Sequence, residues 1–337
     1  MKKLAALCAV LACAGWLAWL FETRTPLRPV EAPALEFDVP PGATPTSIAR
    51  ELEALGLVRH PLVFRALVAL RGSGPRLRAG HYTIEGPLTL EQLLDKLEKG
   101  EVARRALTFP EGRNYVEMAA IAASRELDHA RFLAAARDPA PIHDLDPAAT
   151  DLEGYLFPDT YDLPRGRDVE AALVKRMVAR FREVALPLLP RAEAAGLSLR
   201  QWVTLASIVE LETAVAEERP RIAAVFHNRL KKRMTLGTDP TIIYALRLAG
   251  RWDGNIRKKD LDIDSPYNTY RRPGLPPGPI GMPGREALVA VLEPAAVDDL
   301  YFVSRNDGTH HFSKTLAEHE RAVDQYQRRR RAARSGG

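Results

Sequence analysis

Two glutamates, Glu210 and Glu212, lie in the otherwise apolar stretch "ASIVELET" at 206–213. Ionising a carboxyl group in apolar surroundings is costly, so their presence there calls for a reason. A buried carboxyl without a cationic partner has a raised pKa, and it can hold a proton near neutral pH and then release it. This is the property that a general acid needs in the cleavage of a glycosidic bond.

Helical periodicity separates the two glutamates. The apolar pattern predicts a buried helix from Leu199 to Glu217 with Ser198 as its N-cap. At about 100° per residue, Glu210 shares its face with small and medium side chains, and Glu212 lies nearly opposite. Small neighbours would let a substrate approach, which favours Glu210 as the acid. The alternative is a structural role, with a helix terminus or an arginine as partner: Arg200, Arg219 or Arg221.

A loop with unusual composition follows at 265–284, "SPYNTYRRPGLPPGPIGMPG". Its prolines and glycines are typical of a linker, but Tyr267, Asn268 and Tyr270 offer aromatic faces and an amide that suit sugar binding. Asn228, in "AAVFHNRL", has two open interpretations. It can satisfy loop carbonyls from a packed helix, or it can belong to a polar cluster that faces the site.

No metal site and no cofactor are expected. His310, His311 and His319 lie near the C-terminus, but the sequence has no HExxH and their spacing matches no compact zinc site. Cys8 and Cys13 both lie in the N-terminal segment, so the body of the chain has no disulfide framework and no thiolate ligands.

The N-terminus predicts a membrane anchor. Lys2 and Lys3 precede an uncharged run from Leu4 to Phe21, which as a helix would span roughly 27 Å. We expect an uncleaved single-pass transmembrane helix at 1–22, in the inner (cytoplasmic) membrane, with the catalytic part in the extracytoplasmic space. A cleaved signal peptide is the alternative, because it has the same charged start and apolar middle.

Composition and patterning predict an α+β protein of several parts. Hydrophobic residues make up 46% of the 337-residue chain and charged residues 27%, which is ordinary for a globular protein. A Pro-rich linker is expected at 23–35, a small βααβ module at 36–102 and a larger mixed domain at 103–327. The basic tail at 328–337 is expected to be a solvated terminus. Although the net charge of the chain is +5, no nucleic-acid partner is expected.

Local signals place several element ends. Thr46 and Thr89 are predicted N-caps, and Gly100 is predicted to close the helix that Thr89 begins. A long helix is expected from Val169 to Leu186. Asn306-Asp307-Gly308 is predicted to be the turn of a hairpin.

Several segments taken together resemble one family, the endolytic murein transglycosylases (MltG/YceG-like). The resemblance implies a membrane anchor, a LysM-like module at 36–102 and a catalytic domain that cuts the glycan strands of peptidoglycan. The matching segments are "EGYLFPDTY" (153–161), "ASIVELET" (206–213), "VFHNRL" (225–230), "TDPTIIY" (238–244), "YNTY" with "GLPPGPI" (267–280), and "LYFV" with "DGTHHFSKTLAEH" (300–319).

The resemblance also implies roles for single residues. The catalytic glutamate of the family occupies the first acidic position of the "ASIVExET" motif, which is Glu210, and Glu212 and Thr213 would support it. The other residues expected to bind substrate or support the site are Glu153, Tyr155, Asn228, Thr238, Asp239, Tyr244, Tyr267, Asn268 and Tyr270.

The implied reaction is cleavage of the bond between N-acetylmuramic acid and N-acetylglucosamine within a strand, which leaves a 1,6-anhydro end. Action on nascent strands as a terminator of elongation, with cell-wall synthesis proteins as partners, is also implied. Two rival functions remain. One is a glycan hydrolase that uses Glu210 with a second carboxylate, Glu153 or Asp239, and the other is a non-catalytic, membrane-tethered peptidoglycan-binding scaffold.

Overall fold

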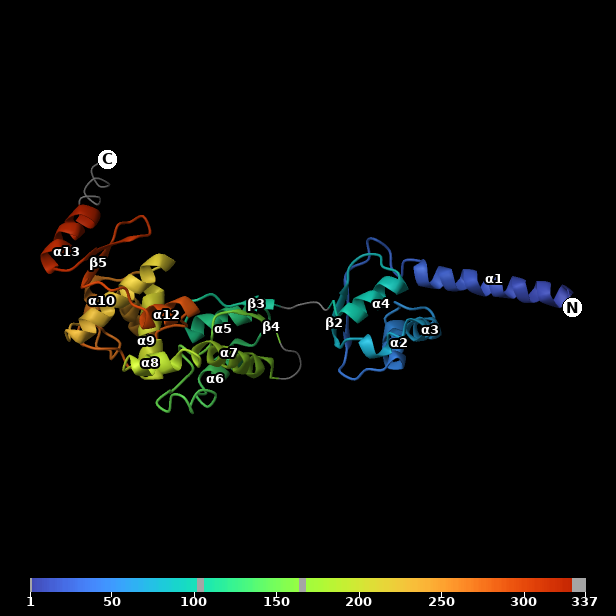
Figure 1. The fold of residues 1–337 in the computed structure, drawn as a ribbon, viewed down its shortest axis with the longest axis horizontal. Coiled ribbons are helices and arrows are strands. Elements are labelled where there is room, and N and C mark those ends of the chain that lie inside the picture. The colour runs from blue at the N-terminus through green and yellow to red at the C-terminus, as the bar shows by residue number, and fades with distance from the viewer. Residues whose placement is uncertain (1, 102–105, 164–167, 329–337) are drawn as a thin grey trace. The chain divides into compact units, whose positions relative to one another are not determined.

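The structure, a computed structural model, describes residues 2–101, 106–163 and 168–328 (Figure 1). The chain divides into two compact units, Met1–Arg105 and Ala106–Gly337. The expected domain boundary between residues 102 and 103 lies outside the described residues, as does the expected basic tail from residue 329 onward. Each unit has its own hydrophobic core.

The small unit contains a two-stranded antiparallel sheet covered by helices. Its strands pair with Leu35 opposite Ile84 and Val39 opposite Gly80, and two helices connect them. In chain order its elements are α1 (Lys2–Arg24), β1 (Leu35–Val39), α2 (Pro45–Ala54), α3 (Pro61–Arg71), the 3-10 turn η1 (Gly74–Arg76), β2 (Gly80–Ile84) and α4 (Leu90–Lys99).

Side-chain caps fix the ends of these helices. Thr89 begins α4 in a capping box with Gln92, and Gly100 ends it in the left-handed conformation, with φ of 67°, as predicted. The predicted cap of α2 is wrong. Thr44, not Thr46, accepts a hydrogen bond from the backbone N–H of Ser47 at 3.1 Å, because Pro45 occupies the first helical position.

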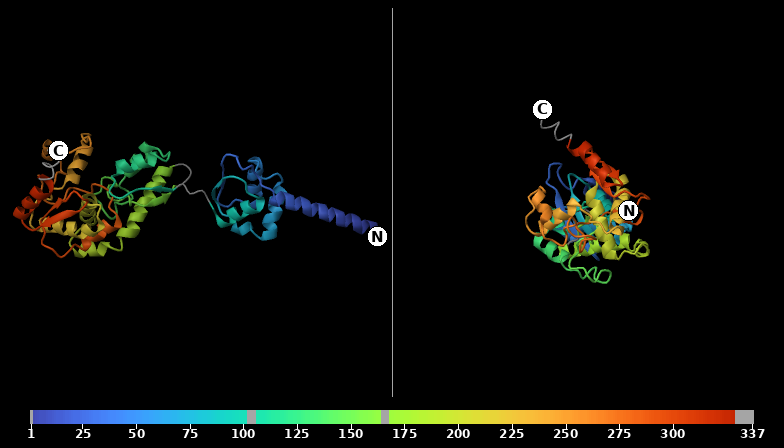
Figure 2. Two further views of the ribbon diagram at one scale, coloured as in Figure 1. Left: turned by 90° about the horizontal axis from the view of Figure 1, so that it is seen from above. Right: turned by 90° about the vertical axis from the view of Figure 1, so that its left-hand side faces the viewer.

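The expected transmembrane anchor at 1–22 is corrected. Across the part of the chain that the structure describes, no helix has both the length and the apolar character needed to cross a bilayer. Figure 2 shows α1 as a single straight rod. Its last turns contact protein, since Trp19 packs against the core of the small unit and Thr23 is buried.

The segment expected to be a linker, 23–35, is also attached to the small unit. The Leu27 N–H donates to the Leu88 carbonyl oxygen at 2.8 Å, and an Arg28 guanidinium nitrogen donates to the Ile84 carbonyl oxygen at 3.2 Å. The residues between α1 and β1 therefore pack on the sheet end instead of standing free.

The large unit is mostly helical, with two small antiparallel sheets, β3–β4 and β5–β6. In chain order its elements are β3 (Ala106–Thr108), α5 (Tyr115–Ala123), α6 (His129–Ala136), β4 (Thr160–Asp162), α7 (Val169–Ala185), α8 (Leu189–Ala194), α9 (Leu199–Glu212), the 3-10 turn η2 (Ala216–Glu218), α10 (Arg219–Lys231), α11 (Asp239–Leu248), the 3-10 turn η3 (Lys258–Asp262), α12 (Arg285–Leu292), β5 (Tyr301–Ser304), β6 (His310–Ser313), α13 (Leu316–Val323) and the π-turn η4 (Asp324–Arg328).

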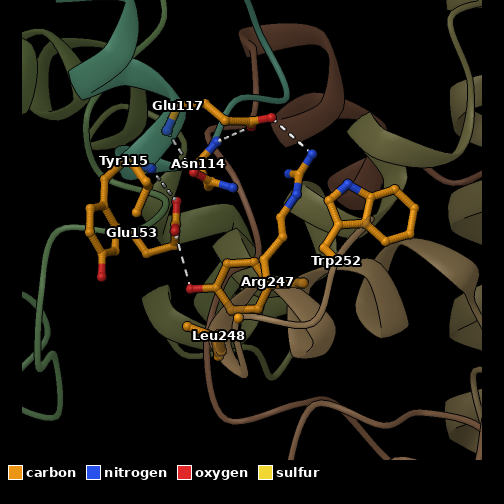
Figure 3. Close-up of a pocket in the computed structure, with 10 residues that line it drawn as sticks. Asn114, Tyr115, Glu117, Glu153, Arg247, Leu248 and Trp252 are labelled. Carbon is orange, nitrogen blue, oxygen red and sulfur yellow. Dashed lines mark hydrogen bonds and ion pairs between the residues drawn. The ribbon is translucent and has the colours of Figure 1, made fainter. Parts of the chain in front are cut away.

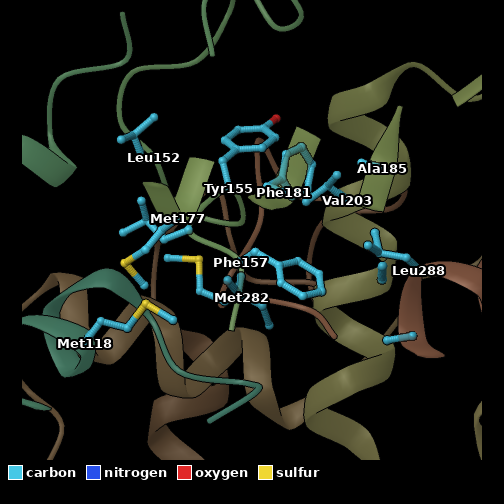
Figure 4. Close-up of a cluster of buried hydrophobic side chains, with 14 of the residues drawn as sticks. Met118, Leu152, Tyr155, Phe157, Met177, Phe181, Ala185, Val203, Met282 and Leu288 are labelled. Atoms are coloured by element: carbon cyan, nitrogen blue, oxygen red, sulfur yellow. The ribbon is translucent and has the colours of Figure 1, made fainter. Parts of the chain in front are cut away.

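Helix α9 is the central element of this unit. It contacts α8, α10, α11 and α12, and Trp202 donates its indole N–H to the Leu288 carbonyl oxygen of α12 at 2.9 Å. Figure 4 shows side chains of α9 and α12, Val203 and Leu288, in one core with residues of α5 and α7. Ser198 caps α9 as predicted, but the helix ends at Glu212 and not at Glu217, because Thr213 is extended.

Candidate active site

Glu210 lies in the last turn of α9 with both carboxyl oxygens occupied. Only 6% of its side chain is exposed. Its Oε1 accepts a hydrogen bond from Arg219 Nη2 at 3.1 Å, and its Oε2 accepts one from the backbone N–H of Gly284 at 2.9 Å. The carboxyl group therefore has a fixed position at the point where α9, α10 and α12 meet.

Arg219 approaches Glu210 from the first residue of α10. Its side chain is 11% exposed, and the same Nη2 that contacts Glu210 lies 3.9 Å from Oε2 of Glu111. Its Nε is buried and has no hydrogen-bond partner among the described residues. A guanidinium has five N–H donors in a fixed fork, so this arginine has donor capacity left over.

Glycines let two other segments approach the same carboxyl. Gly284 is the N-cap of α12, where unpaired N–H groups and the helix dipole favour an anion. Gly112, with φ of 73°, lies against α9, since an added Cβ there would be 3.8 Å from Cγ of Glu210. The Gly112 N–H donates to the Met282 carbonyl oxygen at 2.9 Å, which joins the loop before α5 to the loop before α12.

The condition that the sequence analysis placed on Glu210 is not met in this structure. A raised pKa was expected for a buried carboxyl without a cationic partner, and Glu210 has one in Arg219. Arg219 was among the partners that the structural alternative named. The contact with Arg219 at 3.1 Å is therefore the feature of Glu210 that a catalytic role has to accommodate.

Glu212, two residues further along, has a different environment. Its Oε1 accepts a hydrogen bond from the Thr238 hydroxyl, and no ion pair of Glu212 is found among the described residues. Burial raises the pKa of Glu212 to about 7, Asp239 adds to this, and the Thr238 hydrogen bond opposes it. Glu212 therefore meets the expectation of a buried carboxyl with a raised pKa.

Thr238, Asp239 and Tyr270 surround Glu212. The Tyr270 hydroxyl donates to Oδ1 of Asp239 at 2.6 Å, and the Thr238 N–H donates to Oγ1 of Thr269 at 3.2 Å. Burial and the neighbouring Asp239 raise the pKa of Tyr270, so it stays protonated and donates. The aromatic loop and the start of α11 thus form one hydrogen-bonded group with Glu212.

Glu153 and Tyr244 form a third group, which lines a pocket of about 350 Å³ (Figure 3). Glu153 is 3% exposed, and its two oxygens accept hydrogen bonds from the Tyr244 hydroxyl at 3.1 Å and from the Tyr115 N–H at 3.3 Å. Burial, and to a smaller extent the charge of Asp151, raise the pKa of Glu153 well above its ordinary value. Tyr267 packs on the Tyr244 ring, with centroids 4.8 Å apart.

The rim of this pocket combines apolar and charged groups. Leu248 and Val116 are exposed, and Trp252 lies beside Arg247, whose guanidinium carbon is 6.0 Å from the indole ring. Arg247 pairs with Glu117 at 2.9 Å, as the dashed line in Figure 3 marks. The pocket therefore has a polar floor and a partly apolar mouth, which is typical of small-ligand sites.

Other predicted site residues are occupied by structural hydrogen bonds. The Asn228 amide donates to the carbonyl oxygens of Val297 and Asp299, which agrees with the first of its two interpretations. The Asn268 amide likewise donates to two carbonyl oxygens of its own loop, and this residue is 1% exposed. Neither amide group, as placed here, is free to bind a sugar hydroxyl.

The hydrogen bonds that Tyr155 and Thr213 make in the described part of the chain are with residues other than Glu210. The buried Tyr155 donates its hydroxyl hydrogen to Asp146 at 2.6 Å, and Arg200 pairs with the same Asp146 oxygen at 2.7 Å. Thr213 ends α9, and its hydroxyl oxygen accepts the Val215 N–H at 3.0 Å. Both residues hold the elements around the site in place.

Sequence reasoning missed Glu111, the second carboxylate at Glu210. Its signal was local, since Glu111 lies in "FPEG", a turn that follows a strand, and functional residues are often found on such loops. Burial raises the pKa of Glu111, and so do the nearby charges of Glu210 and Glu286, while Arg219 lowers it. Asn114, Tyr115 and Trp252, which line the pocket, were also missed.

Comparison with known proteins now adds to this geometry. The model of the YceG-like family matches residues 37–325. The endolytic murein transglycosylase of Bacillus subtilis is 32% identical over 319 residues, which cover 89% of this chain and 88% of the relative. The protein of the same name from Streptococcus pneumoniae is 30% identical, covering 94% of this chain and 63% of the relative.

Among solved structures, a YceG-like protein of Listeria monocytogenes is similar in fold and sequence. It is 31% identical with a TM-score of 0.60, and the match covers 86% of this chain and 98% of that one. The family match begins within β1 of the small unit and covers nearly all of the described large unit. The resemblance found in the sequence is confirmed, and this chain belongs to the YceG-like family.

Proposed function

We propose that the chain is a peptidoglycan-cleaving lytic transglycosylase in which Glu210 acts first as general acid and then as general base. Support comes from membership of the YceG-like family and from relatives named endolytic murein transglycosylases. The observation that carries the assignment to Glu210 is its buried carboxyl, held by Gly284 and Arg219 beside the glycine loop at Gly112.

The first step is proton donation. Protonated Glu210 gives its proton to the glycosidic oxygen between N-acetylmuramic acid and N-acetylglucosamine, and the bond from that oxygen to C1 of the muramyl sugar breaks. The leaving sugar departs as an alcohol, and positive charge develops on the muramyl ring as an oxocarbenium-like state.

The second step returns the proton. The Glu210 carboxylate accepts the proton of the muramyl C6 hydroxyl while the C6 oxygen forms a bond to C1, which closes a 1,6-anhydro ring. Between the two steps the Gly284 N–H and Arg219 stabilise the carboxylate with charge-assisted hydrogen bonds. Glu210 is protonated again at the end, so the cycle consumes no water.

A single acid is sufficient for this reaction. Ordinary glycosidases use two carboxyl groups because a water molecule or an enzyme nucleophile must also be activated. Here the nucleophile is a hydroxyl of the same sugar, already held close to the reacting carbon. The raised-pKa group Glu212 and the pocket residue Glu153 are therefore not needed as partners in proton transfer.

The pocket around Glu153 would hold a saccharide unit of the bound strand. Trp252 and Leu248 offer apolar surface for a sugar face or an acetamido methyl group, and the Glu153 carboxyl and Asn114 offer polar contacts. Tyr115 at the pocket is three positions after Gly112, which lies beside Glu210, so the chain between them spans at most about 11 Å. A short oligosaccharide can therefore reach both.

The finer assignments belong to the same proposal. Cleavage is endolytic, within strands, and it acts on nascent strands as a terminator of elongation, which brings the enzyme into contact with cell-wall synthesis proteins. The site of action is extracytoplasmic, where peptidoglycan lies. The names of the relatives support the substrate and the endolytic mode.

Product analysis tests the proposal. Purified peptidoglycan is digested with the wild-type chain and with Glu210→Gln, and the new glycan ends are identified by mass spectrometry. We expect 1,6-anhydro-muramyl ends from the wild type, lighter by one water than reducing ends, and none from the variant. Reducing ends alone would instead support a hydrolase, and equal digestion by both proteins would remove Glu210 from the chemistry.

A further inference from the structure

Arg219 lies between two carboxyl groups, and the proposed mechanism uses only one of them. Its Nη2 is 3.1 Å from Oε1 of Glu210 and 3.9 Å from Oε2 of Glu111. The shorter contact has hydrogen-bond geometry, and the longer is an ion pair without a hydrogen bond. A small movement of the guanidinium would exchange the two partners.

Gly284 brings the two carboxyl groups to the same place. Its N–H donates to Glu210, and an added Cβ on Gly284 would lie 1.7 Å from Oε1 of Glu111. The Glu111 carboxyl therefore occupies the space that a side chain at Gly284 would need. It is the more accessible of the two, since 41% of its side chain is exposed against 6% for Glu210.

The charges around Glu111 come from three helices. Glu210 belongs to α9, Arg219 to α10 and Glu286 to the first turn of α12. The two carboxylates repel the charged form of Glu111, and Arg219 attracts it. With one cation, Arg219, beside both Glu111 and Glu210, ionising both carboxyl groups is less favourable than ionising one of them.

Protonating Glu210 for catalysis leaves the Arg219 guanidinium without its ion-pair partner, and Glu111 can replace that partner. When Glu210 becomes neutral, Arg219 loses its ion-pair partner, and a largely buried cation without a partner is costly. An ionised Glu111 on the other side of the guanidinium removes this cost.

We propose that Glu111 is a positioning residue of the active site, which takes Arg219 over from Glu210 when Glu210 holds the catalytic proton. This inference rests on the proposed function of Glu210. In one state Glu111 is protonated and Arg219 pairs with ionised Glu210. In the other, Glu210 is protonated and Arg219 pairs with ionised Glu111. The three groups carry zero net charge in both states.

The number of protons is conserved over one catalytic cycle in this scheme. The proton moves from Glu111 to Glu210, directly or through solvent at the exposed side of Glu111, and the catalytic cycle then donates it and recovers it at Glu210. Glu111 itself does not touch the substrate in this scheme. Its effect is on the fraction of Glu210 that is protonated at a given pH.

The test is the pH dependence of kcat/KM for peptidoglycan cleavage in wild type, Glu111→Gln and Glu111→Asp. Without an ionisable group at 111, Arg219 stays on Glu210 and keeps it ionised to lower pH. We expect the alkaline limb of the Glu111→Gln profile to move down by about one pH unit, an activity loss of about tenfold near neutral pH that shrinks toward acid pH. Glu111→Asp should restore part of this shift.

Two further variants separate this effect from misfolding. Gly284→Ala keeps the backbone N–H that binds Glu210 but displaces the Glu111 carboxyl, so it should shift the profile in the same direction. Glu293→Gln, just beyond the far end of α12 and paired with Arg191 on the surface, should leave the profile unchanged. Thermal unfolding of each variant reports whether the fold is retained.

The outcomes distinguish the inference from the function on which it rests. Suppose that Glu111→Gln and Gly284→Ala fold, and that their pH profiles of kcat/KM either coincide with that of wild type or are lower by the same factor at every pH. The proposed role of Glu111 is then overturned, while the proposed function of Glu210 stands. If the wild type makes no anhydro ends, or Glu210→Gln is fully active, the function fails first.

Discussion

The two glutamates of "ASIVELET" are two residues apart on one helix, yet they have different chemical environments. Glu210 pairs with an arginine and a backbone N–H, whereas Glu212 accepts a hydrogen bond from a threonine hydroxyl. The arginine and the backbone N–H at Glu210 are donors to a carboxylate. The surroundings of Glu212 raise its pKa to about 7. Partners from distant segments, not position in the motif, decide how each carboxyl behaves.

This difference separates two properties that a catalytic acid needs. Glu212 has a pKa of about 7 chiefly because it is buried, but the Thr238 hydroxyl already occupies one of its carboxyl oxygens. Glu210 lies beside the loop at Gly112 and the start of α12, and its carboxyl is held by Arg219 and by the Gly284 N–H. The predictions below test this contrast.

Glutamine substitution at each position gives the largest expected effect. Glu210→Gln removes the group that transfers the proton, so the cleavage rate should fall by about 10²- to 10⁴-fold. Glu212→Gln keeps the Thr238 hydrogen bond and should cost less than about tenfold. Initial rates of peptidoglycan digestion measure both, and the reverse ranking would make Glu212 the acid.

The raised pKa of Glu212 predicts a pH-dependent stability. The folded chain holds this proton up to about pH 7, whereas the unfolded chain releases it near the ordinary value of 4.5. The contribution of Glu212 to stability is therefore full below pH 4.5 and is lost as pH rises toward 7 and above, by up to about 3 kcal/mol.

Denaturant unfolding of wild type and Glu212→Gln between pH 4 and 8 measures this contribution. The difference in free energy of unfolding between the two should change across that range in favour of the variant at high pH, since glutamine does not titrate. A constant difference would show that Glu212 ionises as easily in the folded chain as in the unfolded one.

Substrate binding tests which side of α9 the glycan occupies. Trp252→Ala removes apolar surface from the pocket around Glu153, and we expect KM to rise by about 3- to 10-fold with kcat little changed. Tyr270→Ala, the matched change beside Glu212, should raise KM less. A larger rise for Tyr270→Ala would place the strand along Glu212 instead.

The smallest effect is expected at Thr238. Thr238→Val preserves the shape of the side chain but removes the hydrogen bond to Glu212, which should lower the free energy of unfolding by about 1 kcal/mol. The pKa of Glu212 should rise further, because that hydrogen bond lowers it. Thermal unfolding and the pH series of the preceding prediction measure the two changes, and an unchanged unfolding curve would mean that the contact contributes nothing.

Sequence signals predicted helix caps and turns correctly where residues close in the sequence determine the structure. Ser198 and Thr89 cap their helices, and the turn at Asn306–Gly308 joins β5 to β6, all as predicted. A cap or a tight turn depends on residues three or four positions apart, so the sequence contains all the atoms that matter. The cap at Thr46 failed by two positions, because Pro45 already starts the helix.

Predictions that depend on surroundings were less successful. The expected transmembrane helix was wrong for the described residues, where α1 ends against the small unit. Helical periodicity could not show that α9 stops at Glu212. The loop residue Asn268 has an amide suited to sugar binding, but in the folded chain that amide donates to backbone carbonyl oxygens. For Asn228 the sequence left two interpretations open, and its contacts in the folded chain agree with the first.

The sequence by itself determined the family, the central helix and the two glutamates that can do chemistry, since these follow from residue identity and short-range periodicity. The tertiary structure decided which charged groups and hydrogen-bond donors lie beside each of the two glutamates. Arg219, Gly284 and Glu111 reach Glu210 from three different segments, and Thr238 reaches Glu212 from a fourth. The protonation of a carboxyl group depends on the charges and hydrogen-bond donors within a few ångströms of it. Residues far apart in the sequence can supply these groups, so the sequence alone does not identify them.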